Sequence, residues 1–174
     1  MRRIFLIWTA LLVAVLLHAQ NATSVLDKSA ATLRAAGNVK IGFTLEVDGG
    51  ASAGYIKLQR QKFVVNVGGS ITWFDGKTMW TYVKANEEVN VTNPSADAVA
   101  KMNPYAFLSF YKKGYTVKMG KGTAKEHEVL LTGKSGSPYT NVVVRINKST
   151  QYPTFIKMTS LKGAVTTIRC NSFL

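Results

Sequence analysis

The chain has 174 residues, enough for one domain with a substantial core, and its 22 basic and 9 acidic residues give a formal net charge of +13. The basic residues are mostly scattered singly and accompany no nucleic-acid-binding motif, so the charge does not indicate a nucleic-acid partner. A solvated basic surface explains the charge, and attraction to anionic membrane head groups or an acidic partner is the alternative. The single cysteine, Cys170, excludes an internal disulfide bond, and we expect a buried small hydrophobe there.

Residues 1–19 have the pattern of a secretory signal peptide. Arg2 and Arg3 precede an apolar run over residues 4–17, and Ala19 supplies the small residue at the cleavage point. A membrane anchor is the alternative, but a run of 14 residues is short for a membrane span. We therefore expect cleavage after Ala19 and one mature domain over residues 20–174. No cysteine lies directly after the cleavage point, where a lipid would be attached, so we expect a soluble exported protein without a lipid anchor.

The first element predicted in the mature chain is an amphipathic helix over residues 23–37. Thr23 or Ser24 could cap its beginning, and Gly37 would end it. The spacing of i, i+4 and i+7 places three residues on one apolar stripe: Leu26, Ala30 and Leu33.

From residue 39 onward the hydrophobic period changes from 3.6 to 2, which is typical of strands with one buried face. Short turn segments separate such runs and predict about ten or eleven strands. Because no helices alternate with these strands, they predict one strongly curved antiparallel sheet rather than a parallel α/β sheet. The apolar positions of the first three strands include Ile41, Phe43, Leu45, Ile56, Leu58, Phe63 and Val65.

A turn at Asp75-Gly76 predicts a β-hairpin over residues 70–84, because glycine accepts the positive φ that such turns need. Folding about a two-residue turn pairs Phe74 with Lys77. One face then carries Ile71, Trp73, Trp80 and Tyr82, and the other carries Phe74, Met79 and Val83. We expect the tryptophan-bearing face to point into the interior of the curved sheet.

Arg60 is in phase with Ile56 and Leu58, so we expect its side chain to point inward at a strand end. A buried guanidinium needs partners. Carbonyl groups at a helix end or the polar head of a ligand could supply them. The alternative is that Arg60 ends its strand and lies in solvent.

Residues 93–115 interrupt the strands and have a helical or looped pattern, because Pro94 and Pro104 each suit the first turn of a helix. The stretch 105–111 is almost wholly apolar, and a short helix that is apolar on nearly all sides must be buried. We expect this segment and the N-terminal helix to cover the open mouth of the sheet. Its large apolar side chains include Tyr105, Phe107 and Leu108.

The sequence predicts no catalytic residues, no metal site and no cofactor. His127 is the only histidine after residue 19, so the mature chain lacks a Ser-His-Asp or Cys-His set, and one histidine does not make a metal site. The acidic residues fall mostly at outward positions or in turns. What remains is a large apolar surface. Side chains could fill the space behind it as a core, or leave it open as a ligand cavity.

Several stretches, in order, resemble the periplasmic outer-membrane lipoprotein carriers, the LolA-like proteins. They are "FTLEVDGG", "GYIKLQRQKFVV", "DGKTMWTYVKANEEV" and "NPYAFL", and the resemblance covers residues 22–135. The Asp-Gly-Lys-x-x-Trp-x-Tyr match at residues 75–82 is the most specific of them. Gln61 departs from the family pattern, which has proline after the functional arginine.

The resemblance implies an unclosed antiparallel β-barrel in which short helices form a lid over a hydrophobic cavity. Arg60 aligns with the arginine that would hold this lid closed through hydrogen bonds. The side chains expected to line the cavity are Ile41, Phe43, Leu45, Ile56, Leu58, Phe63, Val65, Ile71, Trp73, Trp80, Tyr82, Tyr105, Phe107 and Leu108.

The resemblance also implies a function in outer-membrane biogenesis. A monomeric periplasmic chaperone would receive the acyl chains of lipoproteins from an inner-membrane lipoprotein-releasing ABC transporter and deliver them to an outer-membrane acceptor. Such transport makes or breaks no covalent bond, so the lack of catalytic residues is consistent with it. The alternatives are a lipid-binding sensor or regulatory module of the same fold, an interaction domain with a filled core, and, least supported by the residues, a hydrolase.

Overall fold

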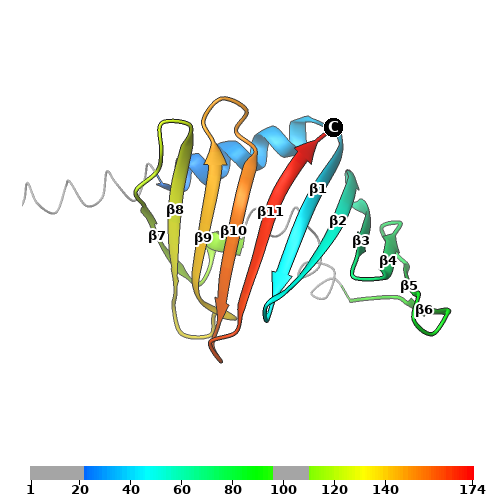
Figure 1. Ribbon diagram of the computed structural model, residues 1–174. Helices are drawn as coiled ribbons and strands as arrows, with labels where there is room; N and C mark the ends of the chain where they lie inside the picture. The colour runs from blue at the N-terminus through cyan, green and yellow to red at the C-terminus, as the bar shows by residue number, and fades with distance from the viewer. Residues whose placement is uncertain (1–21, 96–109) are drawn as a thin grey trace, which may run out of the picture.

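The computed structural model describes residues 22–95 and 110–174, and within them one antiparallel sheet of 11 strands lies against one α-helix (Figure 1). The strand order is β6-β5-β4-β3-β2-β1-β11-β10-β9-β8-β7, so the first and last strands of the order are not paired with each other. The sheet is therefore not closed into a barrel, which confirms the expected mainly-β, unclosed antiparallel fold.

The strands follow the chain in hairpins, apart from the pairing of β1 with the last strand, β11. Their bounds are β1 (Asn38–Val47), β2 (Gly50–Gln59), β3 (Lys62–Val67), β4 (Ser70–Phe74), β5 (Met79–Val83), β6 (Glu88–Thr92), β7 (Tyr115–Met119), β8 (Glu126–Gly133), β9 (Tyr139–Asn147), β10 (Pro153–Ser160) and β11 (Val165–Phe173). A short 3-10 helix, η1 (Phe110–Lys112), precedes β7.

The N-terminal helix covers residues 22–35. Thr23 and Ser24 lie inside it, so their prediction as capping residues is wrong: the backbone is already helical at Ala22. Gly37 follows the helix with φ of 70°, a conformation that suits glycine at a helix end. The predicted stripe is confirmed, because Leu26, Ala30 and Leu33 are all buried.

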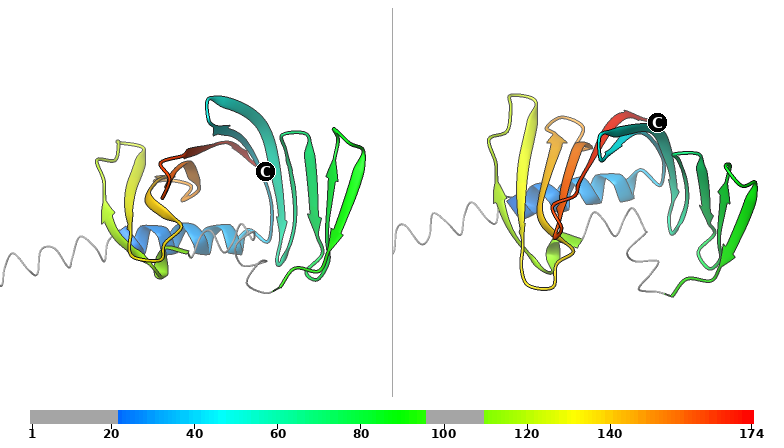
Figure 2. Two further views of the ribbon diagram at one scale, coloured as in Figure 1. Left: turned by 90° about the horizontal axis from the view of Figure 1, so that it is seen from below. Right: turned by 60° about the horizontal axis from the view of Figure 1, so that its bottom comes forward.

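The helix crosses one face of the sheet, which we call the inner face, and β3–β6 continue beyond the helix end (Figure 2). Two clusters of buried side chains lie on the inner face. The β7–β10 cluster contains Ala22, Val25, Leu26, Tyr111, Tyr115, Val129, Leu131, Val142, Val144, Ile146, Ile156 and Met158. The β1–β5 cluster contains Leu33, Val39, Ile41, Leu58, Phe63, Phe74 and Met79.

The β4–β5 hairpin has the predicted faces but not the predicted register. Phe74 pairs with Met79 rather than with Lys77. Residues 75–78 connect the two strands, and the Asp75 N–H donates a hydrogen bond to the Thr78 carbonyl at 3.2 Å. The Asp75 carboxylate accepts hydrogen bonds from the backbone N–H groups of Lys77 and Thr78, both at 2.8 Å, as is typical of such turns. The register differs by an even number of residues, and an even shift leaves every side chain on the same face.

Cys170 is half-buried on β11 and packs against the β1–β5 cluster. Burial raises the pKa of its thiol to about 11.

We expect the Cys170 thiol to react slowly in the native protein. At pH 8 most of it stays protonated, and only the thiolate attacks an alkylating reagent. Modification by iodoacetamide should be at least about ten-fold slower than in the same protein unfolded in guanidinium chloride. Equal rates before and after unfolding, followed by mass spectrometry, would contradict this burial.

Candidate functional site

An apolar wall runs across five strands on the inner face. The pairing Val39–Leu58–Phe63–Phe74–Met79 makes one continuous row from β1 to β5. All five side chains of this row are buried. The rings of Phe63 and Phe74 have their centroids 5.3 Å apart. Such a wall can bind an apolar molecule by excluding water from it.

A second row of the wall lies beside the first. It pairs Ile41 with Ile56, Ile56 with Val65, and Val65 with Thr72. Thr72 pairs with Thr81, and their hydroxyl oxygens share a hydrogen bond of 3.1 Å. These two polar groups therefore satisfy each other and do not interrupt the apolar wall.

The structure places seven of the predicted cavity residues on the inner face. By the register of β1–β3 they are Ile41, Phe43, Leu45, Ile56, Leu58, Phe63 and Val65. Phe43 lies against Gly54, where a Cβ atom would come within 2.9 Å of the Phe43 ring. The inward direction expected for these strands is confirmed, and their contact with a ligand stays a prediction.

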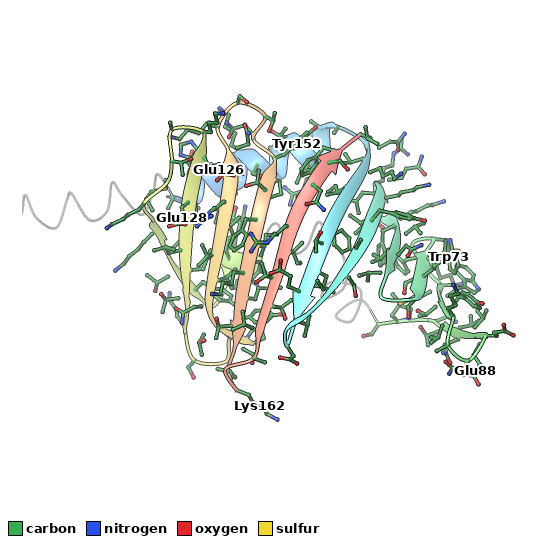
Figure 3. The ribbon with its side chains drawn as sticks, in the orientation of Figure 1. Trp73, Glu88, Glu126, Glu128, Tyr152 and Lys162 are labelled. Carbon is green, nitrogen blue, oxygen red and sulfur yellow. The ribbon has the colours of Figure 1, made fainter. Side chains whose placement is uncertain are left out.

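Four other predicted cavity residues lie on the opposite, outer face, and their expected inward direction is wrong. They are Ile71, Trp73, Trp80 and Tyr82, which pair with one another across β4 and β5. Trp73 is 38% exposed, whereas the neighbouring Phe74 is 4% exposed. The helix packs on the face that carries Phe74 and Met79, so the tryptophans point away from it. Figure 3 labels Trp73 on the part of the sheet formed by β3–β6.

The sequence interpretation missed Phe74 and Met79 as inner-wall residues. Both faces of the hairpin are apolar, and alternation alone could not choose between them. It also missed Tyr152, which lies before β10 and stacks on Phe173 with ring centroids 4.4 Å apart at the border of this wall. Three further predicted cavity residues lie outside the described residues: Tyr105, Phe107 and Leu108.

Beneath the N-terminal half of the helix the interior is nearly filled. A cavity of about 20 Å³ remains there, lined by Leu26, Ser29, Phe110, Tyr111, Leu131, Val144, Ile146, Pro153 and Ile156. The Ser29 hydroxyl is buried in this region and has no hydrogen-bond partner among the described residues. A cavity of this size has room for about one water molecule and not for an acyl chain. The filled-core alternative therefore describes the β7–β10 half of the molecule.

Leu33 connects the helix to the other half. It is 1% exposed and is the helix residue, within the described part of the chain, that belongs to the β1–β5 cluster. Burying a leucine side chain contributes about 1.5–3 kcal/mol relative to leaving it exposed to water. The helix is thus held over the apolar wall by a modest interaction.

Asp27 joins the helix to η1. Its carboxylate accepts a hydrogen bond from the Tyr111 hydroxyl at 2.7 Å and forms an ion pair with Lys112 at 2.9 Å. The bonds from Lys112 and Tyr111 lower the pKa of the Asp27 carboxyl below its usual 3.8. Burial raises the pKa of Tyr111, and the bond to Asp27 raises it further, so the phenol stays protonated and donates.

We expect Asp27→Asn to lower the melting temperature at pH 7 by about 2–4 °C, since a half-exposed pair of this kind contributes about 1 kcal/mol. A carboxyl whose pKa is lowered on folding stabilises the protein above its unfolded pKa. This stabilisation is lost as the pH falls below about 4 and through the lowered pKa. The difference in melting temperature between the two proteins should therefore shrink as the pH falls below about 4 and the Asp27 carboxyl becomes protonated.

Circular dichroism melts at several pH values check this, with Asp48→Asn in the exposed β1–β2 turn as the matched control. Asp48→Asn should lower the melting temperature at pH 7 by less than Asp27→Asn, because none of the ion pairs among the described residues involves Asp48. A difference for Asp27→Asn that persists unchanged at pH 2 would contradict the ion-pair assignment.

Arg60 does not point inward, which corrects the expectation from its phase. It lies in the β2–β3 turn, where its φ is 53° and its side chain is exposed. Strand β2 ends at Gln59, so the alternation that carries Ile56 and Leu58 inward stops one residue before Arg60. No hydrogen bond or ion pair joins Arg60 to another residue of 22–95 or 110–174. Its role as a lid latch stays a prediction.

No group of three histidine, cysteine or acidic side chains within residues 22–95 and 110–174 lies close enough together to hold a metal ion. None of the helices described is long and apolar enough to cross a membrane.

The sequence pattern of the family described as outer membrane lipoprotein carrier protein LolA matches residues 12–162. The chain belongs to this family. LolA-like proteins are periplasmic carriers that bind lipoprotein or lipid cargo. A comparison with curated proteins found no match.

Solved structures share the fold at low sequence identity. An uncharacterised conserved protein from Thermus thermophilus is 12% identical, with a TM-score of 0.60 and coverage of 88% of this chain and 86% of that one. A putative outer membrane lipoprotein-sorting protein domain from Vibrio parahaemolyticus is 11% identical, with a TM-score of 0.50 and coverage of 90% and 92%. The MucA/MucB complex of Pseudomonas aeruginosa contains a chain that is 15% identical, with a TM-score of 0.51 and coverage of 88% and 56%. At these identities the similarity shows the fold alone.

Proposed function

We propose that this protein carries lipoproteins across the periplasm by sheltering their acyl chains between the helix and the inner face of β1–β5. The observation that carries the proposal is the buried row Val39–Leu58–Phe63–Phe74–Met79, which the helix covers through Leu33. The protein would receive its cargo from an inner-membrane lipoprotein-releasing ABC transporter and deliver it to an outer-membrane acceptor. Such a carrier is an exported protein, and it is not an enzyme.

The free energies of burial favour displacement of the helix by the cargo. Burying one CH₂ group is worth about 0.8 kcal/mol, so an acyl chain of ordinary length gains on the order of 10 kcal/mol. The Leu33 contact that covers the wall contributes only about 1.5–3 kcal/mol. An acyl chain can therefore take the place of this contact, and the helix can cover the wall again after the cargo has left.

A transfer measurement tests the proposal. The protein is exported to the periplasm together with an acylated lipoprotein, purified, and examined by native mass spectrometry. We expect a one-to-one complex that releases its cargo to outer-membrane vesicles. The matched control is the same cargo with its acylated cysteine replaced by serine, which should not be retained. Equal retention of both cargo forms, or no complex with either, would contradict a carrier of acyl chains.

A lipid-binding sensor is the second candidate, and it is favoured by the similarity in fold to a chain that forms a complex with a protein partner, in the MucA/MucB structure. A sensor would bind acylated ligands but change its affinity for a protein partner instead of releasing the ligand to a membrane. Cargo that binds and then stays on the protein in the presence of acceptor vesicles would favour the sensor.

A further inference from the structure

An exposed aromatic surface lies on the outer face, opposite the apolar wall. Trp73 pairs with Trp80, Trp80 with Val91, and Tyr82 with both Ile71 and Val89. We call these side chains the aromatic patch: Ile71, Trp73, Trp80, Tyr82, Val89 and Val91. Trp73, Val89 and Val91 are 38%, 56% and 59% exposed. Scattered exposed hydrophobic residues are ordinary on a protein surface, whereas a contiguous patch indicates an interaction site.

A groove continues the patch toward β1. Its volume is about 690 Å³, and Trp73 and Trp80 line it together with Val64. Lys57 pairs with Val64, and Val64 pairs with Trp73, so this row of lining side chains belongs to the outer face. Four residues of the inner row also line the groove: Val39, Leu58, Phe63 and Phe74. Because side chains alternate along each strand, the outer-face row itself points away from the apolar wall.

The charges around the groove are predominantly positive. Lys40, Lys57 and Lys62 line it. The ammonium groups of Lys40 and Lys57 lie 5.3 Å and 5.6 Å from the centre of the Tyr55 ring. Asp75 is the acidic side chain among its lining residues, and its carboxylate is already engaged by two backbone N–H groups of the hairpin turn.

We propose that the outer face of β1–β6 binds the surface of an anionic membrane. Tryptophan and tyrosine favour the boundary between head groups and acyl chains, because their rings are apolar and carry one polar group. Lysines around such rings extend to the lipid phosphates. Removal of residues 1–19 with Arg2 and Arg3 leaves 20 basic and 9 acidic residues, and this net charge of +11 attracts the protein to the same surface. The patch occupies strands that continue past the helix end, where a flat surface can reach it (Figure 2).

This proposal goes beyond the carriage of lipoproteins and does not depend on it. The face that would contact the membrane is opposite the face that would hold the acyl chains. A carrier of this kind could rest on a membrane while its cargo side stays free.

Flotation with lipid vesicles in the absence of any lipoprotein tests the membrane contact. The probe is a mixture of phosphatidylglycerol and phosphatidylethanolamine, and vesicles of phosphatidylcholine are the uncharged comparison. The periplasmic protein should float with the anionic vesicles and not with the neutral ones. Trp73 and Trp80 are the tryptophans that follow residue 19, and their fluorescence should shift to shorter wavelength on binding. Equal binding to both vesicles, or none to either, would overturn the proposal.

Charge variants locate the surface. Each lysine near an anionic membrane contributes about a five-fold change in binding, so Lys40→Gln with Lys57→Gln should lower vesicle binding about 25-fold. The matched control is Lys118→Gln with Lys157→Gln, two exposed lysines on β7 and β10. If this control loses as much binding, the protein binds through its net charge and not through this face.

A substitution in the aromatic patch distinguishes membrane binding from self-association. Trp73→Ser should weaken vesicle binding at least about five-fold, because it removes apolar ring area from the membrane boundary. It should leave the fold intact, because Trp73 is already 38% exposed. Leu130→Ser is the matched control, since Leu130 is equally exposed at 38% on β8. Sedimentation without vesicles shows whether a second copy covers the patch instead. A dimer that Trp73→Ser dissociates would overturn the membrane proposal in favour of self-association.

Discussion

Val65→Asp is expected to abolish the binding of acylated cargo while leaving a folded protein. Val65 is half-buried on the inner face and pairs with Ile56 and Thr72. A carboxylate there would lose its hydration when an acyl chain lies against it, and the cost of an unpaired buried charge is several kcal/mol. We expect the affinity for an acylated lipoprotein to fall by about 100-fold or more, which corresponds to about 3 kcal/mol.

The neighbouring residue offers a matched control. Val64 is also half-buried on β3 but faces outward, between Lys57 and Trp73. Val64→Asp should lose as much strand stability as Val65→Asp, because both replace a β-branched residue by aspartate in the same strand. It should keep the affinity for cargo and lose binding to anionic vesicles.

Two measurements on each variant therefore separate the two faces. Native mass spectrometry reports the cargo complex, and flotation reports vesicle binding. Loss of cargo binding in both variants, with equal melting temperatures, would place the acyl chains somewhere other than the inner wall. Loss of vesicle binding in Val65→Asp alone would contradict the membrane contact of the outer face.

The second large effect is expected from the helix residue that covers the wall. Leu33→Ala should destabilise the protein by about 3 kcal/mol, as large-to-small substitutions of buried leucines do. It should also make the apolar wall more accessible, because Leu33 joins the helix to the β1–β5 cluster. The protein should then take up acylated cargo faster and release it to acceptor membranes more slowly, since the covered empty state is less stable.

Leu26→Ala is the matched substitution on the same helix. Leu26 is buried to a similar degree, at 7% exposed against 1% for Leu33, but it belongs to the β7–β10 cluster. We expect a comparable loss of stability in a urea titration and unchanged rates of cargo uptake and release. If both variants change the transfer kinetics equally, the helix acts through its general stability and not through the cover over β1–β5.

Local patterns in the sequence determined much of the architecture. The alternation over residues 39–47 gave β1, and the stripe of Leu26, Ala30 and Leu33 gave the buried side of the helix. These patterns are informative because one side of each element is apolar and the other is polar, so periodicity identifies both the element and its buried side. The order of such elements also determined the antiparallel sheet.

The tertiary structure alone decided which side of the β4–β5 hairpin is covered. Trp73 and Phe74 are both large and apolar, and they point to opposite faces. Periodicity assigns the two faces correctly but gives no preference between them. The helix that covers Phe74 precedes the hairpin by about forty residues, and only the long-range packing of the β1–β5 cluster brings Leu33 over it.

The sequence also did not determine where the Arg60 side chain points. Its phase with Leu58 held only while the strand continued, and β2 ends at Gln59. A turn residue with φ of 53° no longer follows the alternation of a strand, so Arg60 lies in solvent while Leu58 stays buried. The sequence by itself therefore determined the elements and their apolar sides. Packing between distant segments decided which apolar side became the interior, because that choice depends on where the covering helix lies and not on any local period.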